Sequence, residues 1–226
     1  MIFEKKLNFI DLSLQITSGM QKYHANYHPV TKIVKTANHK NDKREVRKII
    51  TGTHSGTHID APVHFINYGK SIDKYKLNHF LGPARLLDFS RVKNRTEISL
   101  ESVKKITKNK LSEKIIIFRF DWTDKFYGKK NFYIDHPFLS PELCRWLVKQ
   151  KVKLIGLDIP QPDNPFNSRN SINDGINHKI LLSNDVLILE YMTNLKRIKK
   201  NYFFFVGAPL NIKESDGSPC RALAIY

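Results

Sequence analysis

Cysteine is scarce in this chain of 226 residues, and long apolar runs are absent from its sequence. Two cysteines, Cys144 and Cys220, are too few for a disulfide framework, which favours a reducing cytoplasm. The longest apolar runs, such as Ile115–Phe118 and Phe203–Val206, fall far short of the roughly 18 residues that a transmembrane helix needs. Charged residues at the N-terminus have no apolar stretch behind them, so no secretory signal is visible. We therefore expect a cytoplasmic protein without a membrane span.

Acidic residues are also few: the chain has 21 Asp and Glu and 38 Lys and Arg, which gives a net charge of +17. Most of these cations are lysines, and clusters such as Lys104–Lys105 are typical of solvated surfaces. A nucleic-acid-binding protein is expected to favour arginine and to carry a known reading motif. The sequence has no Cys/His finger, no RNP-like string and no P-loop. The charge therefore predicts no specific nucleic-acid partner.

The apolar content, 41% of the residues with 11% aromatic, is sufficient for a full hydrophobic core. At roughly 100–200 residues per domain, the length predicts one domain, and no Pro/Gly/Ser-rich linker divides the chain. Short β-type runs bounded by turn residues recur along it. They are 44–50, 84–89, 115–120, 152–157, 186–190, 202–206 and 221–226. The pattern predicts a single strand-rich domain of the α+β or mixed α/β class.

Helices are signalled less often than strands. One is predicted after Ser140, which can cap it, with Pro141 in the first position and apolar residues spaced along one face. Leu100–Ile106 and His178–Leu182 are weaker candidates. Two stretches, Thr17–Asn41 and Asp158–Asn177, look irregular, and loops of such length in compact domains are usually disordered or functional.

The most informative segment packs three histidines and one carboxylate into eleven positions: His54, His58, Asp60 and His64. Imidazole nitrogens and carboxylate oxygens are ligands of Zn²⁺ and related divalent ions. His58 and Asp60 are two apart, so in an extended chain their side chains point to the same side. A bend at Gly56 could fold His54 back towards His58, and Pro62 could turn His64 into the same space. A lone surface histidine would need no explanation, but this cluster is rare by chance. Because structural zinc sites usually use cysteine, the cluster predicts a catalytic metal site with one position open for water.

The string from His54 to Phe65 resembles the signature of the cyclase-like metal hydrolases, which include bacterial kynurenine formamidase and isatin hydrolase. Further segments resemble this family in order along the chain. They are Asp11–Ser13 with Gly19–Met20, Leu139–Glu142 with Trp146–Leu147 and Gly156–Asp158, His178–Leu182, Leu189–Leu195, and Pro209–Leu210 with Gly217–Ala222. The resemblance implies one cyclase-like metal hydrolase domain over residues 1–226, of the swivelling β/α type.

The resemblance also implies a ligand set. His54, His58 and Asp60 would hold a first ion, Asp60 would bridge to a second, and His178 and Glu190 would complete the pair. One or two ions of Zn²⁺ or Mn²⁺ per chain are expected. Glu190 ends an apolar strand, where a buried carboxylate is costly unless it is paired or coordinated. For His178 the sequence alone favours a surface histidine at the start of a helix, and only the resemblance favours a ligand.

These ligands suggest the chemistry. A divalent ion makes hydroxide available at neutral pH, because it lowers the pKa of bound water from about 15.7 to near 7. The implied reaction is hydrolysis of a small amide, with His64 as proton acceptor and donor and Glu190 also at the catalytic centre. N-formylkynurenine, cleaved to kynurenine and formate in tryptophan catabolism, is the first candidate. The alternatives are hydrolysis or closure of a cyclic amide or lactone, and an inactive binding protein, which the presence of His64 disfavours. No G-x-S-x-G elbow supports a serine hydrolase.

The opening region departs from the resembled family. Kynurenine formamidases carry a Gly-Met-Pro-x-Trp stretch where this chain has Gly19–Tyr23, so Tyr23 is the expected ring for substrate stacking. His24 and His28 have no clear counterpart. In the family this region helps to form the active site across a homodimer contact, so a homodimer or higher even oligomer is expected.

Overall fold

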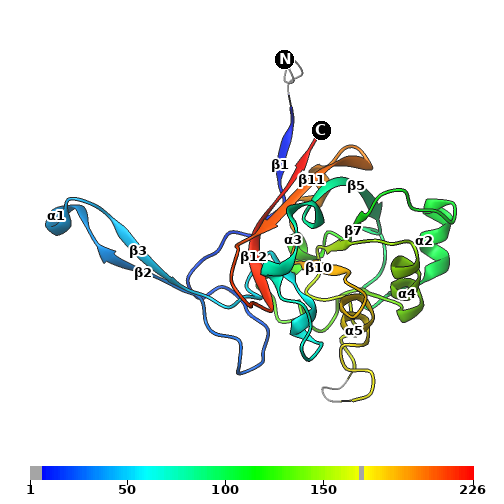
Figure 1. Cartoon of the computed structure of the whole chain (residues 1–226), viewed down its shortest axis with the longest axis horizontal. Coiled ribbons are helices and arrows are strands. Elements are labelled where there is room, and N and C mark those ends of the chain that lie inside the picture. Colours follow the sequence, from blue (N-terminus) through cyan, green and yellow to red (C-terminus); the bar gives the residue numbers. More distant parts are fainter. Residues whose placement is uncertain (1–6, 168–170) are drawn as a thin grey trace.

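The computed structural model describes residues 7–167 and 171–226, and its central feature is a curved sheet that closes on itself (Figure 1). The strand order is β1-β12-β11-β5-β7-β9-β10-β4, and β4 also pairs with β12, which closes the ring. The strands are β1 Phe9–Asp11, β4 His58–Asp60, β5 Leu81–Asp88, β7 Ile115–Arg119, β9 Leu154–Leu157, β10 Leu187–Glu190, β11 Tyr202–Pro209 and β12 Gly217–Ile225. Neighbours from β5 to β10 are parallel, and the other pairs are antiparallel. This strand-rich mixed sheet confirms the predicted fold class.

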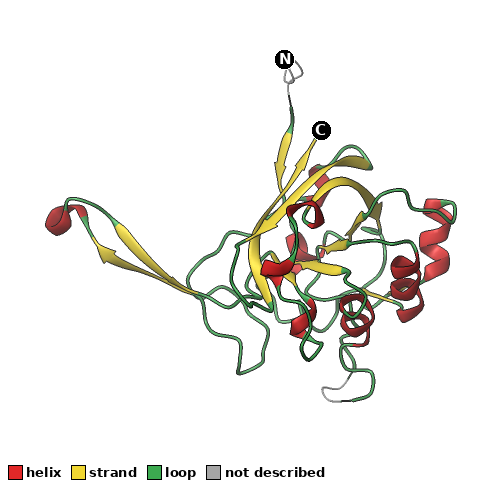
Figure 2. Cartoon of the chain, viewed as in Figure 1, coloured by secondary structure: helices red, strands yellow, loops and turns green. Residues whose placement is uncertain are grey.

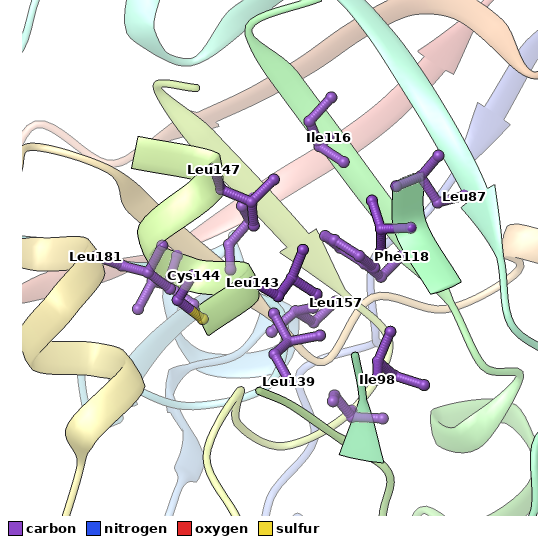
Figure 3. Close-up of a cluster of buried hydrophobic side chains, with 14 of the residues drawn as sticks. Leu87, Ile98, Ile116, Phe118, Leu139, Leu143, Cys144, Leu147, Leu157 and Leu181 are labelled. Atoms are coloured by element: carbon purple, nitrogen blue, oxygen red, sulfur yellow. The ribbon is translucent and has the colours of Figure 1, made fainter. Parts of the chain in front are cut away.

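Helices cover one side of the closed sheet, as Figure 2 shows. They are α2 Leu100–Thr107, α4 Pro141–Lys149 and α5 Ile176–Leu182, with the short α3 Trp122–Phe126 nearby. The strand β7 supplies both apolar layers: Ile116 and Phe118 pack towards the helices, while Ile115 and Ile117 belong to the other cluster. Because successive side chains of a strand point to opposite faces, one apolar strand can serve two cores. Figure 3 shows the helix-facing cluster, in which α4 packs on β7.

The helix α4 begins as the sequence predicts. Ser140 Oγ accepts a hydrogen bond from the Leu143 backbone N–H at 3.1 Å, and Pro141 occupies the first turn. The inward face, Leu143, Cys144, Trp146 and Leu147, is buried. The predicted helices near residues 100 and 178 are also present, although α5 begins earlier, at Ile176.

A long hairpin projects away from the rest of the chain (Figure 1). It is formed by β2 Lys32–Ala37 and β3 Val46–Ile50, joined through α1 His39–Asp42. The prediction that Thr17–Asn41 is irregular is therefore wrong for its last part. Every residue of β3 is exposed, and no residue of β2 is buried. The predicted β run at 44–50 is present as β3, but β2 buries no residue among the described part of the chain, so its sequence carries no alternation that would have revealed it.

The remaining short elements connect the sheet. They are β6 Glu97–Ile98 paired with β8 Phe138–Leu139, and the 3-10 turns Pro62–His64, Ile72–Lys74, Leu77–His79 and Leu195–Arg197. Between Leu157 and Ile176, the described residues form neither helix nor strand, as predicted; residues 168–170 of that segment lie outside the description. Cys144 and Cys220 are free thiols. Within the described ranges, none of the helices has both the length and the apolarity to cross a membrane.

Replacing Ser140 by Ala tests the cap of α4. We expect the free energy of unfolding to fall by about 1 kcal/mol, because the Leu143 N–H loses its acceptor at the start of the helix. Urea denaturation measures this change. Ser112→Ala is the control, since Ser112 is exposed and should change the free energy by less than about 0.5 kcal/mol. Equal stability of the two variants would contradict the assigned cap.

Candidate metal centre

The short strand β4 positions two of the predicted ligands. His58 and Asp60 flank Ile59, which packs into the second apolar cluster, so the two polar side chains point together to the opposite face. Both are 1% exposed. The strand lies between β10 and β12, in a register that sets His58 opposite Glu190. A residue far along the chain is thereby placed beside the histidine cluster.

A sharp bend returns His54 to the same place. Gly56 has a φ of 62°, in the left-handed region that glycine adopts without strain. The bend brings His54 Nδ1 to 2.7 Å from Asp60 Oδ1. A Cβ at Gly217, on the neighbouring strand β12, would lie 3.0 Å from the His54 ring and 2.7 Å from the Ile59 carbonyl oxygen. Glycine at position 217 therefore leaves the space that the imidazole occupies.

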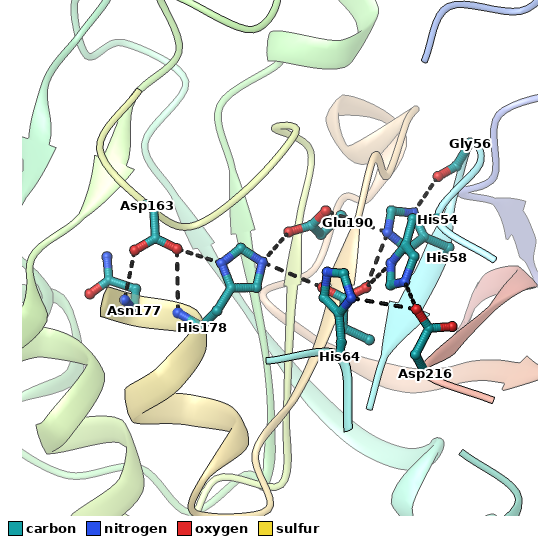
Figure 4. Close-up of polar contacts among 10 residues, drawn as sticks. His54, Gly56, His58, His64, Asp163, Asn177, His178, Glu190 and Asp216 are labelled. Carbon is teal, nitrogen blue, oxygen red and sulfur yellow. Dashed lines mark hydrogen bonds and ion pairs between the residues drawn. The ribbon is translucent and has the colours of Figure 1, made fainter. Parts of the chain in front are cut away.

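The helix α5 and the end of β10 supply the other two predicted ligands (Figure 4). His178 Nε2 lies 3.3 Å from Glu190 Oε1 and 3.5 Å from Asp60 Oδ2. On the other side, His58 Nε2 lies 3.2 Å from Asp60 Oδ1 and 3.5 Å from Glu190 Oε2. The structure thus brings together all five residues that the resemblance nominated as ligands, although their segments are separated by more than a hundred residues.

Three atoms at this centre are buried without any hydrogen-bond partner: His58 Nε2, Asp60 Oδ2 and Glu190 Oε1. Such atoms are rare in folded proteins because burying a polar atom without a partner is costly. The other nitrogen of His58, Nδ1, lies 2.8 Å from the Gly56 carbonyl oxygen. It must donate there, which leaves the Nε2 lone pair for a cation. A divalent ion would satisfy all three atoms, and nitrogen with carboxylate oxygen suits either Zn²⁺ or Mn²⁺.

Charges at the centre are strongly coupled. Burial opposes ionisation of Asp60, but the surrounding histidines hold its pKa well below the usual value. Burial and the charge of Asp60 together raise the pKa of Glu190. Burial also disfavours a charged His54, yet Asp60 and Asp216 outweigh it and raise the pKa of His54 to about 10. In the metal-free protein, protons therefore take the place that a cation would fill.

His64 stands at the edge of this cluster. It ends the 3-10 turn after β4, and its ring stacks on the His54 ring with centroids 3.9 Å apart. Burial lowers the pKa of His64, in spite of the hydrogen bond that its ring donates to Asp216. A neutral imidazole beside the ligands is suited to accept a proton. Ligand atoms of His54, Asp60 and His64 also lie within 4.8 Å of one another, so the geometry alone would permit His64 to bind metal.

A cavity of about 740 Å³ opens over the centre, and Tyr23, the expected ring for substrate stacking, is among the residues that line it. The Tyr23 ring lies 5.8 Å from the ring of His28, which in turn lies 6.1 Å from that of His54. Burial lowers the pKa of His28 to about 4, so this wall of the cavity is uncharged at neutral pH. His24 is exposed and contacts Tyr133 at 5.2 Å between ring centroids.

Two aspartates at the centre were not found by sequence reasoning. Asp216, in the turn before β12, accepts a hydrogen bond from His54 Nε2 at 2.9 Å and lies 3.5 Å from His64 Nδ1. Asp163 accepts one from His178 Nδ1 at 2.5 Å. No spacing links either residue to the histidines, and the only signal for Asp163 was its place in a long loop.

Comparison with known proteins identifies the family of this chain. The family model described as "Putative cyclase" matches residues 10–164. The chain belongs to the cyclase family. Among the curated relatives, the kynurenine formamidase of Geobacillus thermodenitrificans is 33% identical over 78% of this chain and 78% of its own length. An isatin hydrolase bound to the product analogue thioisatinate matches with a TM-score of 0.85 and 20% identity, over 97% of this chain and 92% of that chain.

The likeness extends beyond the segment that the family model matches. A potential metal-dependent hydrolase with cyclase activity has a TM-score of 0.75 and 24% identity, over 97% of this chain and 98% of that chain. The fold of this cyclase-family chain therefore includes the part that carries His178 and Glu190. Membership of the family and the curated relatives confirm the predicted family and the prediction of a hydrolytic enzyme.

Metal binding should displace protons. At pH 7 the His54 imidazole, with a pKa of about 10, is protonated in the metal-free protein, whereas a ligand must be neutral. We therefore expect Zn²⁺ to release protons on binding and its apparent affinity to rise between pH 6 and pH 9. Calorimetric titration in two buffers of different ionisation enthalpy measures the release. His54→Gln should release fewer protons, and pH-independent affinity in the wild type would refute the expectation.

Proposed function

We propose that this chain is a metal-dependent hydrolase of a small amide, with N-formylkynurenine as the first candidate substrate. The observation that carries the proposal is a set of three buried atoms, from His58, Asp60 and Glu190, that have no hydrogen-bond partner. They lie below a cavity and beside the neutral His64. The kynurenine formamidase relatives support an amide as the substrate class.

Each residue of the centre then has a role. His54, His58 and Asp60 would hold one ion, and His178 and Glu190, with Asp60 shared, would hold a second. When bound, a divalent ion of the Zn²⁺ or Mn²⁺ type supplies a Lewis acid for the carbonyl group and makes water acidic enough to ionise near neutral pH. The buried partners of these ligands hold them in place, so the centre needs little rearrangement during the reaction.

His64 would move the proton. Asp216 Oδ2 lies 3.5 Å from His64 Nδ1, which leaves Nε2 for proton exchange. We expect Nε2 to accept a proton from the attacking water and to donate it to the leaving amine. The stacked His54 ring restricts rotation of His64, so that the imidazole keeps one orientation in both steps.

The aromatic wall of the cavity fits a planar substrate. Tyr23 and Phe65 both line it, and Tyr23 takes the place of the tryptophan expected from kynurenine formamidases. This chain lacks the proline and tryptophan of the kynurenine formamidase stretch. Hydrolysis of a cyclic amide or lactone by the same groups is therefore a second candidate function. A panel of N-formylkynurenine, N-formylaniline, isatin and a lactone, each with and without added Zn²⁺ or Mn²⁺, separates the two candidates. No metal-dependent turnover of any of them would contradict the proposal.

Two histidine variants should distinguish a metal ligand from the group that transfers the proton. His58→Ala removes a ligand, so metal content and activity should fall together. His64→Ala should keep its metal, because His54, His58 and Asp60 still hold it, but should lose about 10²–10⁴-fold in activity, mainly in kcat. Elemental analysis and steady-state kinetics on the best substrate of the panel measure both. Loss of metal in His64→Ala as complete as in His58→Ala would make His64 a ligand.

We also propose that the protein is a homodimer or a higher even oligomer. The segment that carries Tyr23 and His28 to the cavity continues directly into the projecting hairpin, whose Val34, Val46 and Ile49 are exposed in the single chain. A second copy is the occupant that would bury this arm, because the arm extends from the edge of the active site.

Sedimentation velocity tests the assembly. We expect wild type to sediment as a dimer or larger at micromolar concentration, and Ile49→Glu to shift it towards monomer, because a charge would enter an apolar contact. Tyr68→Glu is the control, since Tyr68 is 95% exposed and belongs to the segment that follows the 3-10 turn of His64, outside the hairpin strands. An active, strictly monomeric wild type would rule out this assembly.

A further inference from the structure

Asp163 is a buried carboxylate that no ligand prediction used. It lies in the loop after β9 and is 3% exposed. Its Oδ2 accepts from His178 Nδ1 at 2.5 Å and from the His178 backbone N–H at 3.3 Å, while its Oδ1 accepts from the Asn177 N–H at 2.6 Å (Figure 4). One carboxylate therefore holds both the first turn of α5 and the ring of a proposed ligand.

These contacts determine which nitrogen of His178 faces the metal centre. An ionised carboxylate can only accept hydrogen bonds, so His178 Nδ1 must carry the proton. The lone pair of the neutral ring is then on Nε2, the atom that lies 3.3 Å from Glu190 Oε1 and 3.5 Å from Asp60 Oδ2. The carboxylate thereby selects the tautomer that can bind a cation at this place.

The face of the same ring is also fixed. Phe65 stacks on His178 with centroids 4.3 Å apart and planes inclined by 16°. Gly175, just before α5, has a φ of 59°, and a Cβ there would collide with the Phe65 ring. Asp163 holds the imidazole in its plane and Phe65 holds it from one side, so neither rotation nor tilting of the ring is free.

We infer that Asp163 is a positioning residue for the metal ligand His178: it fixes the tautomer and orientation of that ring and so raises the affinity of the centre for its cation. The inference rests on the metal centre of the proposed function and assigns to the loop after β9 a part in metal binding. A carboxylate bound to the outer nitrogen of a ligating imidazole makes it a stronger donor, and loss of such a partner typically weakens metal binding about 10–100-fold.

The chain contains a matched control for this carboxylate. Asp158 is 2% exposed in the same loop, and it also accepts from two backbone N–H groups, those of Phe120 and Asp121, each at 2.7 Å. Among the residues that the structure describes, no imidazole donates to the Asp158 carboxylate. Asp163→Asn and Asp158→Asn therefore each replace one of two acceptor oxygens by an amide NH₂ group, but only the first removes the negative charge from the partner of His178.

Mn²⁺ titration followed by electron paramagnetic resonance tests the inference, because the signal of free Mn²⁺ measures binding without any substrate. We expect Asp163→Asn to bind Mn²⁺ about 10–100-fold more weakly than wild type, and Asp158→Asn to bind it within about twofold of wild type. Thermal unfolding of the metal-free proteins should show that both variants lose stability. Affinities of Asp163→Asn and Asp158→Asn that agree would overturn the inference and make Asp163 merely structural.

A second measurement needs no variant at position 163. Long-range ¹H–¹⁵N spectra of the zinc-loaded wild type should show the His178 ring protonated at Nδ1 and bound to metal through Nε2, with the resonance assigned by its loss in His178→Gln. Coordination through Nδ1 would overturn the inference even if Asp163→Asn did not fold. Wild type that binds neither Mn²⁺ nor Zn²⁺ would overturn the metal centre itself, and the inference with it. Binding by wild type with unchanged affinity in Asp163→Asn would overturn the inference alone.

Discussion

Two buried carboxylates, Asp60 and Glu190, face one another across neighbouring strands, and their repulsion constrains the surrounding structure. They are 1% and 5% exposed, and each charge makes the other harder to bury. The fold offsets this cost by setting His54, His58 and His178 around them. The three histidines still leave one atom of each carboxylate without a hydrogen-bond partner. A divalent cation is the group that fits this remaining need, because it supplies positive charge and takes both nitrogen and oxygen ligands.

Such a centre requires a rigid support, and the closed sheet provides it. β4 has only three residues, yet it pairs with β10 on one edge and with β12 on the other. Ile59 secures it in one apolar cluster, while the opposite face of the neighbouring strands continues into the helix-facing cluster. The polar centre therefore lies beside both apolar clusters. These clusters exclude water from the side of the centre that faces the core, while the opposite side opens into the cavity.

Each of the three histidine rings has its own hydrogen-bond partner outside the centre. His58 bonds the Gly56 carbonyl oxygen, His178 bonds Asp163, and His54 bonds Asp216. Each of these partners fixes one ring nitrogen and leaves the other for the centre. They come from three different loops, so the protonation of each ring depends on a different part of the fold. The strands of the exposed hairpin bury no residue against the described part of the chain, in keeping with the proposed role in assembly.

The sequence by itself determined the segment from His54 to His64, because ligand types at close spacing are local and because alternation along a strand places His58 and Asp60 on one side. It also determined the cap of α4 and the apolar strands, whose patterns depend on near neighbours. Only the tertiary structure decided that Glu190 pairs opposite His58, and that Asp163 and Asp216 complete the histidine contacts. Strand register and loop return join residues far apart in the chain, and no local pattern records which distant residue they will meet. In the hairpin, β3 was predicted but its partner β2 was missed for a related reason: no residue of β2 is buried, so folding left no periodicity in its sequence.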